Sequence, residues 1–197
     1  MQNATERAQK VKAILTDVDG ILTDGKVNFF FQNGQLDEFK SFHTQDGIAA
    51  LLCRKAGIIL GIITGRRHET TVRRADILGY NYIYQGFLSK LGPLEDILKR
   101  EHLTADQVAY IGDDLTDLPL LKAVGFAATV PGAVPQVKKA AHFISARNGG
   151  DGAYREIVDF ILTAQHKLDT LTQEVQNGWT LPAKSPMQVI TSREGLD

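Results

Sequence analysis

Two apolar segments of this chain end in groups of aspartates. Asp17 and Asp19 follow the run "AILT", while Asp113 and Asp114 follow "VAYIG", and Asp117 comes about one helical turn later. Carboxylates that converge in a partly buried place repel one another and are costly to remove from water, so the pattern calls for a cation nearby. A ligand set made only of oxygens suits Mg²⁺, which also leaves room for a phosphate oxygen. The sequence therefore predicts a magnesium site.

Two further apolar segments end in residues that suit phosphoryl transfer. Thr64, Gly65 and Arg66 follow "IILGII", and Lys90 comes shortly after "YIYQG". Phosphoryl transfer requires that the reacting groups are positioned and that charge on the phosphoryl oxygens is cancelled. Lys90 and Mg²⁺ would supply positive charge, while Thr64 and nearby backbone N–H groups would donate hydrogen bonds. A carboxylate nucleophile would form an aspartyl-phosphate that water then hydrolyses.

The spacing of Asp17 and Asp19 predicts two separate roles in one reaction. On an extended chain, residues two apart point to the same side, so one carboxylate could attack phosphorus while the other transfers protons. A lone DxD or GDD occurs at many solvated turns, and a lone lysine indicates little. The ordered set DxDG, TGR, lysine and GDDxxD, each part after a strand-sized run, favours a phosphohydrolase.

Strand-sized runs alternate with amphipathic segments along most of the chain. The runs span residues 12–18, 58–64, 82–86, 108–112 and 126–130, and the helical segments between them end near Gly57, Gly79 and Gly125. This alternation predicts βαβ units, hence an α/β fold with a Rossmann-like parallel sheet and flanking helices. Such sheets place functional residues beyond the carboxyl ends of their strands.

One insertion and one tail depart from this alternation. Residues 25–41 read as a small β-hairpin, with Asn33 and Gly34 at its turn. The chain between Asp19 and Thr64 holds only this hairpin and one helix, too little for a separate cap domain. We predict a single domain over residues 1–168 and a C-terminal tail over 169–197 that is extended and mobile unless docked.

Bulk composition argues against several classes of partner. The net charge of the 197 residues is −1 and no run of Lys or Arg exceeds two, which argues against nucleic-acid binding, including base stacking on Phe29, Phe30 and Phe31. The sequence has no apolar run of 18 residues and no signal-peptide pattern at its start, so we expect no membrane partner. A single cysteine, Cys53, in an apolar stretch fits a free core thiol and a cytoplasmic location.

These motifs resemble the haloacid-dehalogenase superfamily of aspartyl-phosphate hydrolases over residues 11 to about 165. The stretches "DVDGILTDG", "IITGR", "YIGDDLTDLPLL" and "GGDGAYREIVDFIL" are similar to its small branch without a cap. That branch contains phosphatases of 3-deoxy-D-manno-octulosonate 8-phosphate and of nine-carbon, sialic-acid-type sugar 9-phosphates. The resemblance implies a haloacid-dehalogenase fold and Mg²⁺-dependent hydrolysis of a small phosphorylated sugar acid.

Roles for individual residues also follow from the resemblance. It implies that Asp17 is the nucleophile and Asp19 the general acid/base. Asp17 and Asp113 would bind Mg²⁺ through their carboxylates and Asp19 through its backbone carbonyl. The residues that would hold the phosphoryl group or the substrate are Thr64, Gly65, Arg66, Lys90 and Arg155. Asp114 and Asp117 would support the metal ligands.

The resemblance leaves two substrates open. Arg66 matches the pattern of the octulosonate phosphatases, which favours 3-deoxy-D-manno-octulosonate 8-phosphate and a role in lipopolysaccharide biosynthesis, whereas nine-carbon enzymes often carry an acidic residue there. Asp151 replaces an arginine of the family pattern, which puts substrate recognition in question, although Arg155 could serve instead.

Two non-hydrolytic functions fit less well. A phospho-signalling receiver has its phospho-acceptor aspartate on a later strand, followed by Thr and then Lys, whereas here an acid pair opens the chain and GDDLTD follows Lys90. A non-catalytic scaffold would need a broken motif, and all the motifs are intact.

The hairpin predicts an assembly. In "KVNFFFQ", Val27, Phe29 and Phe31 fall on one side of a strand and Phe30 on the other. A two-stranded ribbon cannot bury these rings alone. Resembling proteins form tetramers, so we expect a homotetramer through the hairpin in which neighbouring subunits complete the substrate pocket.

Overall fold

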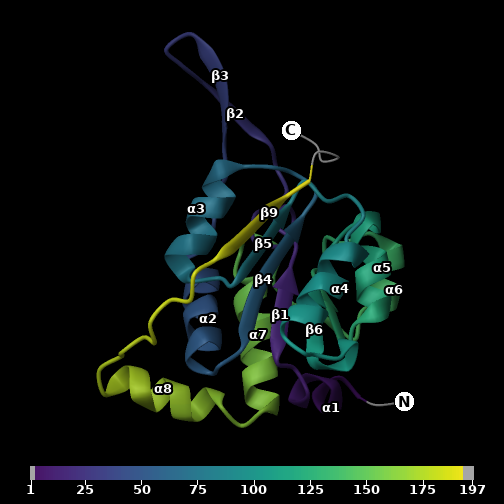
Figure 1. The fold of residues 1–197 in the computed structure, drawn as a ribbon, viewed down its shortest axis with the longest axis vertical. Coiled ribbons are helices and arrows are strands. Elements are labelled where there is room, and N and C mark those ends of the chain that lie inside the picture. Colours follow the sequence, from purple (N-terminus) through teal and green to yellow (C-terminus); the bar gives the residue numbers. More distant parts are fainter. Residues whose placement is uncertain (1–2, 193–197) are drawn as a thin grey trace.

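The predicted parallel sheet is present in the computed structural model, which describes residues 3–192 (Figure 1). Seven strands pair in parallel in the order β8-β7-β6-β1-β4-β5-β9. They are β1 (Ala13–Thr16), β4 (Ile59–Thr64), β5 (Tyr82–Gln85), β6 (Val108–Ile111), β7 (Phe126–Thr129), β8 (Phe143–Ile144) and β9 (Gln188–Thr191). The carboxyl ends of these strands share one edge of the sheet.

Helices cover both faces of the sheet. The chain moves outward from β1 in one direction through α2 and α3, and in the other through α4, α5 and α6, so right-handed crossovers place the two groups on opposite faces (Figure 1). The helices are α1 (Ala4–Gln9), α2 (Thr44–Lys55), α3 (Glu69–Leu78), α4 (Leu91–Arg100), α5 (Leu118–Ala123), α6 (Pro135–Ala140), α7 (Ala153–Ala164) and α8 (Leu168–Gln176). Short 3₁₀ turns span Ala105–Gln107 and Leu115–Asp117.

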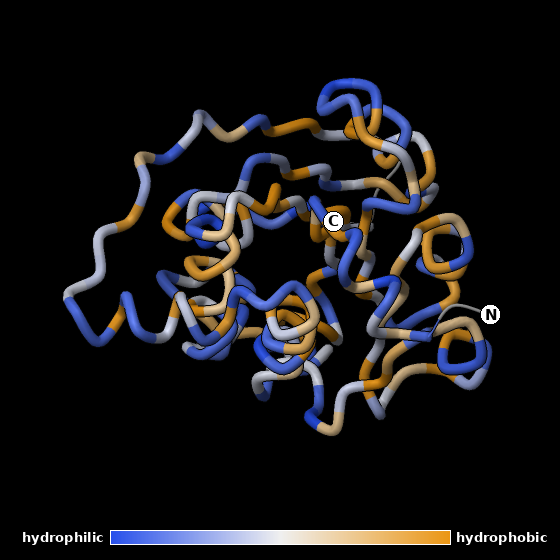
Figure 2. Tube along the Cα trace, turned by 90° about the horizontal axis from the view of Figure 1, so that it is seen from below, coloured by the Kyte–Doolittle hydropathy of each residue, from blue (hydrophilic) through white to orange (hydrophobic). Residues whose placement is uncertain are grey.

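The core lies between the sheet and these helices. Strand residues such as Ile14, Leu15 and Ile83 are fully buried, as is Ile97 of α4. Near-continuous apolar strands are expected where a parallel sheet is covered on both faces. The helices carry both hydrophobic and hydrophilic residues along their turns, which matches one buried and one solvated side (Figure 2).

Two of the three predicted helix ends have the left-handed backbone that glycine adopts readily. Gly79 caps α3 with φ +75°, and Gly57 follows α2 with φ +72°. Gly125 serves a different purpose, because a Cβ there would lie 2.2 Å from the backbone oxygen of Asp106. That glycine allows two loops to pass in contact.

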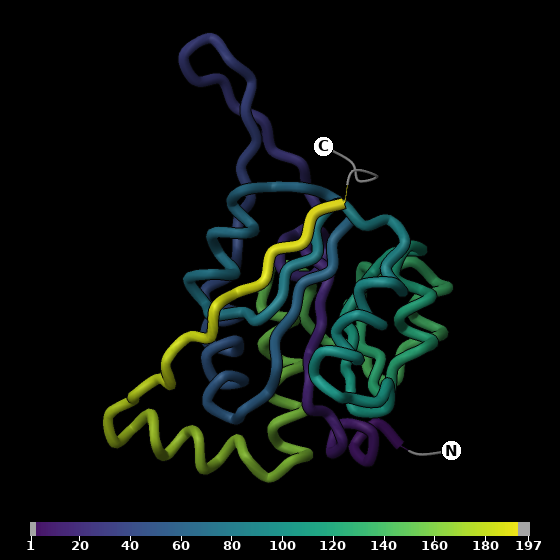
Figure 3. Tube along the Cα trace, in the orientation of Figure 1, coloured from purple at the N-terminus to yellow at the C-terminus, as the bar shows by residue number. Residues whose placement is uncertain are grey.

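The predicted hairpin consists of β2 (Asn28–Gln32) and β3 (Gln35–Phe39) and projects beyond the carboxyl edge of the sheet (Figures 1 and 3). Asn33 and Gly34 both have positive φ, at 51° and 77°, as a tight two-residue hairpin turn requires. Between residues 3 and 192 there is no further insertion that could form a separate cap. The predicted fold class is confirmed.

The C-terminal segment is docked rather than free. After α8, the chain returns along the molecule and β9 pairs with the outer edge of β5, from Tyr82↔Gln188 to Gln85↔Thr191 (Figure 3). Hydrogen bonds from Arg54 to the Pro182 carbonyl and from Lys55 to the Thr180 carbonyl hold the intervening stretch. None of the helices in residues 3–192 has the length and apolar character needed to span a bilayer.

Candidate active site

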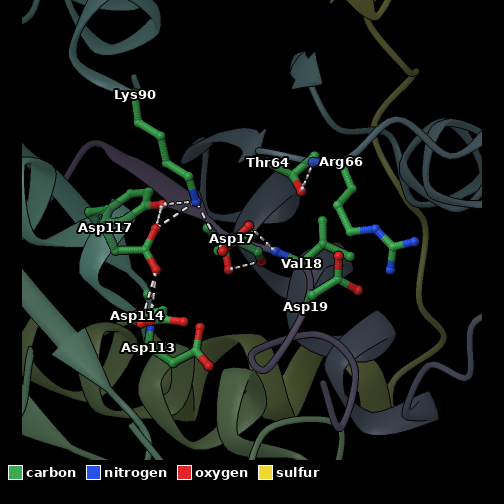
Figure 4. Close-up of polar contacts among 12 residues, drawn as sticks. Asp17, Val18, Asp19, Thr64, Arg66, Lys90, Asp113, Asp114 and Asp117 are labelled. Carbon is green, nitrogen blue, oxygen red and sulfur yellow. Dashed lines mark hydrogen bonds and ion pairs between the residues drawn. The ribbon is translucent and has the colours of Figure 1, made fainter. Parts of the chain in front are cut away.

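Most of the predicted site residues surround one pocket at the carboxyl edge of the sheet (Figure 4). The pocket encloses about 310 Å³ and is lined by Asp17, Asp19, Gly25, Thr64, Gly65, Arg66, Leu88, Lys90, Asp113, Asp114 and Thr116. A larger hollow of about 600 Å³ lies at the opposite edge, beside the amino-terminal ends of β1 and β6, and contains none of the predicted residues. The pocket at the carboxyl edge is therefore identified as the candidate site by the chemistry of its side chains and not by its volume.

A buried ion pair lies at the base of this pocket. The Lys90 ammonium is 2.9 Å from Asp17 Oδ2, while Asp17 Oδ1 accepts a 2.7 Å hydrogen bond from the backbone N–H of Val18. Burial raises the pKa of Asp17 to about 6, against the opposing influence of Lys90. Burial alone would lower the pKa of Lys90, but the facing carboxylates of Asp17 and Asp117 raise it above its usual value. Lys90 is therefore a cation throughout the neutral range.

Asp117 holds the other side of Lys90. The Lys90 ammonium is 2.6 Å from Asp117 Oδ1, which also accepts the Tyr110 hydroxyl, and Asp117 Oδ2 accepts the backbone N–H groups of Asp113 and Asp114 at 2.9 and 3.1 Å. A Cβ at Gly112 would lie 2.4 Å from Asp117 Cγ, so only glycine permits this approach. Asp117 is fully buried, and its four hydrogen bonds fix both the lysine and the loop that carries Asp113.

Asp113 is a second pocket carboxylate whose acidity is changed by its surroundings. Burial and the negative charges of Asp17 and Asp117 raise its pKa to about 7. A Cβ at Gly20, which has φ +89°, would lie 2.0 Å from Asp113 Oδ2. The backbone just after Asp19 therefore passes directly against the Asp113 carboxylate.

This donor set fits a divalent cation bound by oxygen atoms. Asp17, Asp113 and Asp117 each offer a carboxylate oxygen within 4.8 Å of the others. Asp117 accepts four hydrogen bonds, whereas Asp17 has one contact on each oxygen, so Asp17 and Asp113 keep more capacity for Mg²⁺ and their role as its carboxylate ligands stays a prediction. The cation would stabilise their ionised forms, which burial and mutual repulsion disfavour in its absence.

Asp19 differs from its predicted geometry. The expectation that Asp17 and Asp19 share one side of an extended strand is wrong, because β1 ends at Thr16 and residues 18–20 turn. The backbone N–H groups of Leu22 and Thr23 close this turn on the Val18 carbonyl. Asp19 still lines the pocket, but its side chain points away from Lys90 (Figure 4).

Hairpin residues contact both Asp19 and Arg66. The Lys40 ammonium donates to Asp19, and the Arg66 guanidinium lies 2.6 Å from Glu38 Oε2. Sequence reasoning missed Glu38 and Lys40, although their spacing of two residues along a strand was a usable signal, and it also missed Tyr110. Burial and the neighbouring carboxylates raise the pKa of Tyr110 well above its usual value, so its hydroxyl stays protonated and donates to Asp117.

The remaining predicted residues divide into two groups. Thr64 is buried at the end of β4 and lines the pocket, as does Asp114, whose carboxylate caps the following 3₁₀ turn. Arg155 lies on α7, where its Nε atom is 2.8 Å from both carboxylate oxygens of Asp159, and it is not among the described residues that line the pocket. Asp151 is exposed, and its carboxylate is 4.0 Å from His43 Nε2. A role of Arg155 in substrate binding stays a prediction.

Known proteins are similar to this chain in sequence and in fold. A family model described as haloacid dehalogenase-like hydrolase matches residues 78–157. The 3-deoxy-D-manno-octulosonate 8-phosphate phosphatase of Yersinia pestis is 38% identical over 85% of this chain and 88% of its own length, and that of Haemophilus influenzae is 38% identical over 82% and 88%. The crystal structure of the Moraxella catarrhalis phosphatase, in complex with a magnesium ion, a phosphate ion and a KDO molecule, superposes with a TM-score of 0.83 at 37% identity, covering 88% and 98% of the two chains.

The chain belongs to the haloacid dehalogenase-like hydrolase family. The resemblance drawn from the motifs is thereby confirmed. A second solved member of similar fold, a probable phosphatase from Pseudomonas syringae, matches 91% of this chain and 100% of its own with a TM-score of 0.84 at 37% identity. The match covers most of the chain and is not confined to the motif segments.

The raised pKa values of Asp17 and Asp113 predict how Mg²⁺ stabilises the protein at different pH. Both values lie above the ordinary value of 3.8, so the metal-free fold loses stability as the pH rises from about 3.8 to about 6 for Asp17 and about 7 for Asp113, and the loss is complete above those values. A bound divalent cation offsets this loss. We expect Mg²⁺ to raise the melting temperature clearly at pH 8 and little at pH 5, relative to EDTA, in thermal unfolding followed by circular dichroism.

The matched variant for this experiment is Asp113→Asn. It removes one ligand and one repulsive charge, so its metal-free form should lose less stability as the pH rises, and Mg²⁺ should stabilise it weakly at pH 8. Equal stabilisation of the original protein by Mg²⁺ at pH 5 and pH 8 would contradict the assignment.

Proposed function

We propose that this protein is a Mg²⁺-dependent phosphatase that hydrolyses 3-deoxy-D-manno-octulosonate 8-phosphate to 3-deoxy-D-manno-octulosonate and phosphate, in lipopolysaccharide biosynthesis. The observation that carries the proposal is the convergence of Asp17, Thr64, Lys90 and Asp113 on one pocket. The octulosonate phosphatases that match most of the chain, and the solved complex of one with magnesium, phosphate and KDO, support it further. The reaction takes a single phosphate monoester and water.

The phosphoryl group binds over Asp17. Lys90 lies within 2.9 Å of the nucleophilic carboxylate, so a phosphoryl oxygen beside Asp17 also contacts the ammonium. The Thr64 hydroxyl and the backbone around Gly65 line the same pocket and donate hydrogen bonds to the remaining oxygens. Mg²⁺, held by Asp17 and Asp113, supplies further positive charge next to the transferring group. This arrangement stabilises a charged, in-line transition state.

The reaction proceeds in two displacements. A carboxylate oxygen of Asp17 forms a bond to phosphorus while the ester P–O bond breaks, and its electron pair leaves on the sugar oxygen, which takes a proton from Asp19. Water then attacks the phosphorus and gives a proton to Asp19, and the bond from phosphorus to Asp17 breaks to return the free carboxylate. The products are the sugar acid and inorganic phosphate.

The hairpin supports a homotetramer. Val27, Phe29, Phe31, Leu36 and Phe39 are all exposed, and Phe31 leaves 77% of its surface open. The register pairs Phe31 with Leu36 and places Phe30 opposite Asp37, so Leu36 lies on the face that carries Phe29 and Phe31. Exposed rings on a projecting ribbon favour association of identical hairpins, which would place a neighbouring subunit next to each pocket. We extend the proposal to this assembly and to a cytoplasmic location.

Substitution of the nucleophile tests the reaction type. Asp17→Asn removes the attacking carboxylate and one ligand of Mg²⁺, so we expect the turnover of 3-deoxy-D-manno-octulosonate 8-phosphate to fall by at least a thousandfold, roughly what loss of a nucleophile costs. Phosphate release with and without Mg²⁺ measures it. Asp24→Asn, in the same loop but paired with exposed Lys26, is the control and should stay near the original rate. An Asp17→Asn enzyme within tenfold of the original would disprove the assignment.

A substrate panel tests the sugar-acid specificity. Arg66 lines the pocket and favours the eight-carbon substrate, whereas Asp151 in place of the family arginine leaves a nine-carbon 9-phosphate as the alternative. We expect kcat/KM for 3-deoxy-D-manno-octulosonate 8-phosphate to exceed that for sialic-acid-type 9-phosphates by tenfold or more. The reverse preference would assign the enzyme to the nine-carbon substrates and leave the reaction type unchanged.

Substitution of the exposed phenylalanines of the hairpin tests the proposed homotetramer. Light scattering at micromolar concentration should give a mass near four times 21.7 kDa, and the double substitution Phe29→Ser with Phe31→Ser should lower both the mass and the activity together. Ile77→Ser, an exposed position on α3, is the matched control and should change neither. A single-chain mass with full activity in the original protein would refute a shared site.

A further inference from the structure

Lys40 is a buried cation beside the pocket that the proposed reaction does not use. It follows β3 directly, at the point where the hairpin returns to the domain, and only 3% of its side chain is exposed. Its ammonium donates to Asp19 and lies 3.9 Å from Glu38 Oε1. A lysine is rarely buried to this degree without a carboxylate partner, because removal of its charge from water is costly.

The same hairpin provides an internal comparison. Where the chain enters the hairpin, Lys26 pairs with Asp24 at 2.9 Å, but 75% of the Lys26 side chain is exposed, so that pair is solvated and contributes little. Asp24 and Asp19 both lie in the loop after β1. The Lys26–Asp24 pair is therefore on the surface, whereas the Lys40–Asp19 pair is largely buried and includes the residue assigned to proton transfer.

Lys40 is itself held in place by neighbouring charges. Glu38, two residues earlier, lies 2.6 Å from the Arg66 guanidinium and 3.8 Å from His68 Nε2. Asp19, Lys40, Glu38 and Arg66 thus form a row of alternating charges from the pocket to the base of the hairpin. Neither Lys40 nor Asp19 can change position without breaking contacts along this row.

We propose that Lys40 is a positioning residue for Asp19, on which proton transfer to the leaving group depends. The proposal rests on the proposed function, in which Asp19 gives its proton to the ester oxygen as the P–O bond breaks. The Lys40 ammonium donates to Asp19 Oδ1, so in the acid form the other carboxyl oxygen can carry the proton toward the ester oxygen, and the same hydrogen bond holds the group in place after the transfer. Loss of Lys40 therefore slows hydrolysis most for esters whose leaving oxygen is strongly basic and must be protonated as the P–O bond breaks.

Leaving-group dependence separates this role from a general effect on folding or on substrate binding. Phenyl phosphate and p-nitrophenyl phosphate are nearly equal in size, but nitrophenolate leaves readily without a proton and phenolate does not. The quantity to compare is kcat/KM, because it reports only the steps up to departure of the alcohol. Neither probe carries a sugar acid, so contacts between the enzyme and that part of the substrate do not affect the kcat/KM values that are compared.

The experiment measures kcat/KM for both probes in the original enzyme and in Lys40→Met, Lys40→Arg, Lys26→Met and Asp19→Asn. We expect Lys40→Met to lose about tenfold more activity on phenyl phosphate than on p-nitrophenyl phosphate, within the range for general acid catalysis. Lys40→Arg should recover most of the difference, and Lys26→Met should behave as the original enzyme. In the Asp19→Asn background, Lys40→Met should add no further sensitivity to the leaving group.

Chemical restoration of the ammonium by aminoethylation makes the same comparison within one purified variant, before and after alkylation. Cys53 is fully buried in the core, whereas position 40 lies at the base of the projecting hairpin, where Lys40→Cys replaces a long side chain with a short one and so opens space for 2-bromoethylamine; alkylation then restores an ammonium at nearly the original position. The ratio of the two kcat/KM values should shift back on alkylation. This measurement tests the role of Lys40 even if the Lys40→Met variant does not fold.

The outcomes distinguish the two proposals. Equal loss on both probes in Lys40→Met, with a clear leaving-group effect in Asp19→Asn, overturns the role of Lys40 and leaves the proposed reaction intact. The absence of a leaving-group effect in Asp19→Asn instead overturns the general-acid assignment in the proposed function.

Discussion

The site is organised by the repulsion between carboxylates that the fold forces together. Oxygens of Asp17, Asp113 and Asp117 lie within 4.8 Å of one another, and Lys90 is the cation that contacts two of these residues directly. One ammonium cannot neutralise three carboxylates, and the pKa values of Asp17 and Asp113 are raised by burial first and by the neighbouring negative charges second. The same imbalance makes the pocket receptive to a divalent cation, and the cation in turn makes it receptive to a phosphate ester.

Close backbone contacts maintain this arrangement. Gly112 and Gly20 each lie where a Cβ would collide with an aspartate side chain, so the acidic loops can approach one another only through glycine. Gly149 has a similar role, because a Cβ there would lie 1.8 Å from the Gly20 backbone oxygen. Segments from three distant parts of the sequence therefore meet at one loop, and its shape is set by backbone packing more than by side-chain contacts.

The sequence was sufficient to predict five of the seven strands, the hairpin and the acidic edge of the sheet, because these follow from local patterns, whereas the short strand β8 lay outside the predicted runs. Apolar runs of strand length define the sheet, Asn33-Gly34 defines the turn, and acids at strand ends define the edge. The direction of Asp19 was not predictable from its spacing, because the chain turns immediately after Asp17 and tertiary contacts decide where it points. Tyr110 looked like an ordinary strand residue, and its hydrogen bond to Asp117 depends on a lysine from another strand end. The strand β9 was missed because a short polar segment gains strand structure only from the edge it joins.

The pairing of β9 with β5 has a consequence for how the chain folds. The partners are separated by 106 residues, as between Gln85 and Thr191, which is close to the separation of β1 from β6, so the two contacts have similar entropy costs and β9 differs in being made last among the described strands. Synthesis must pass residue 191 before the edge of β5 can be covered. Until then the nascent domain carries an open strand edge of the kind that recruits other chains, and its vulnerable interval lasts from the completion of β5 until β9 arrives.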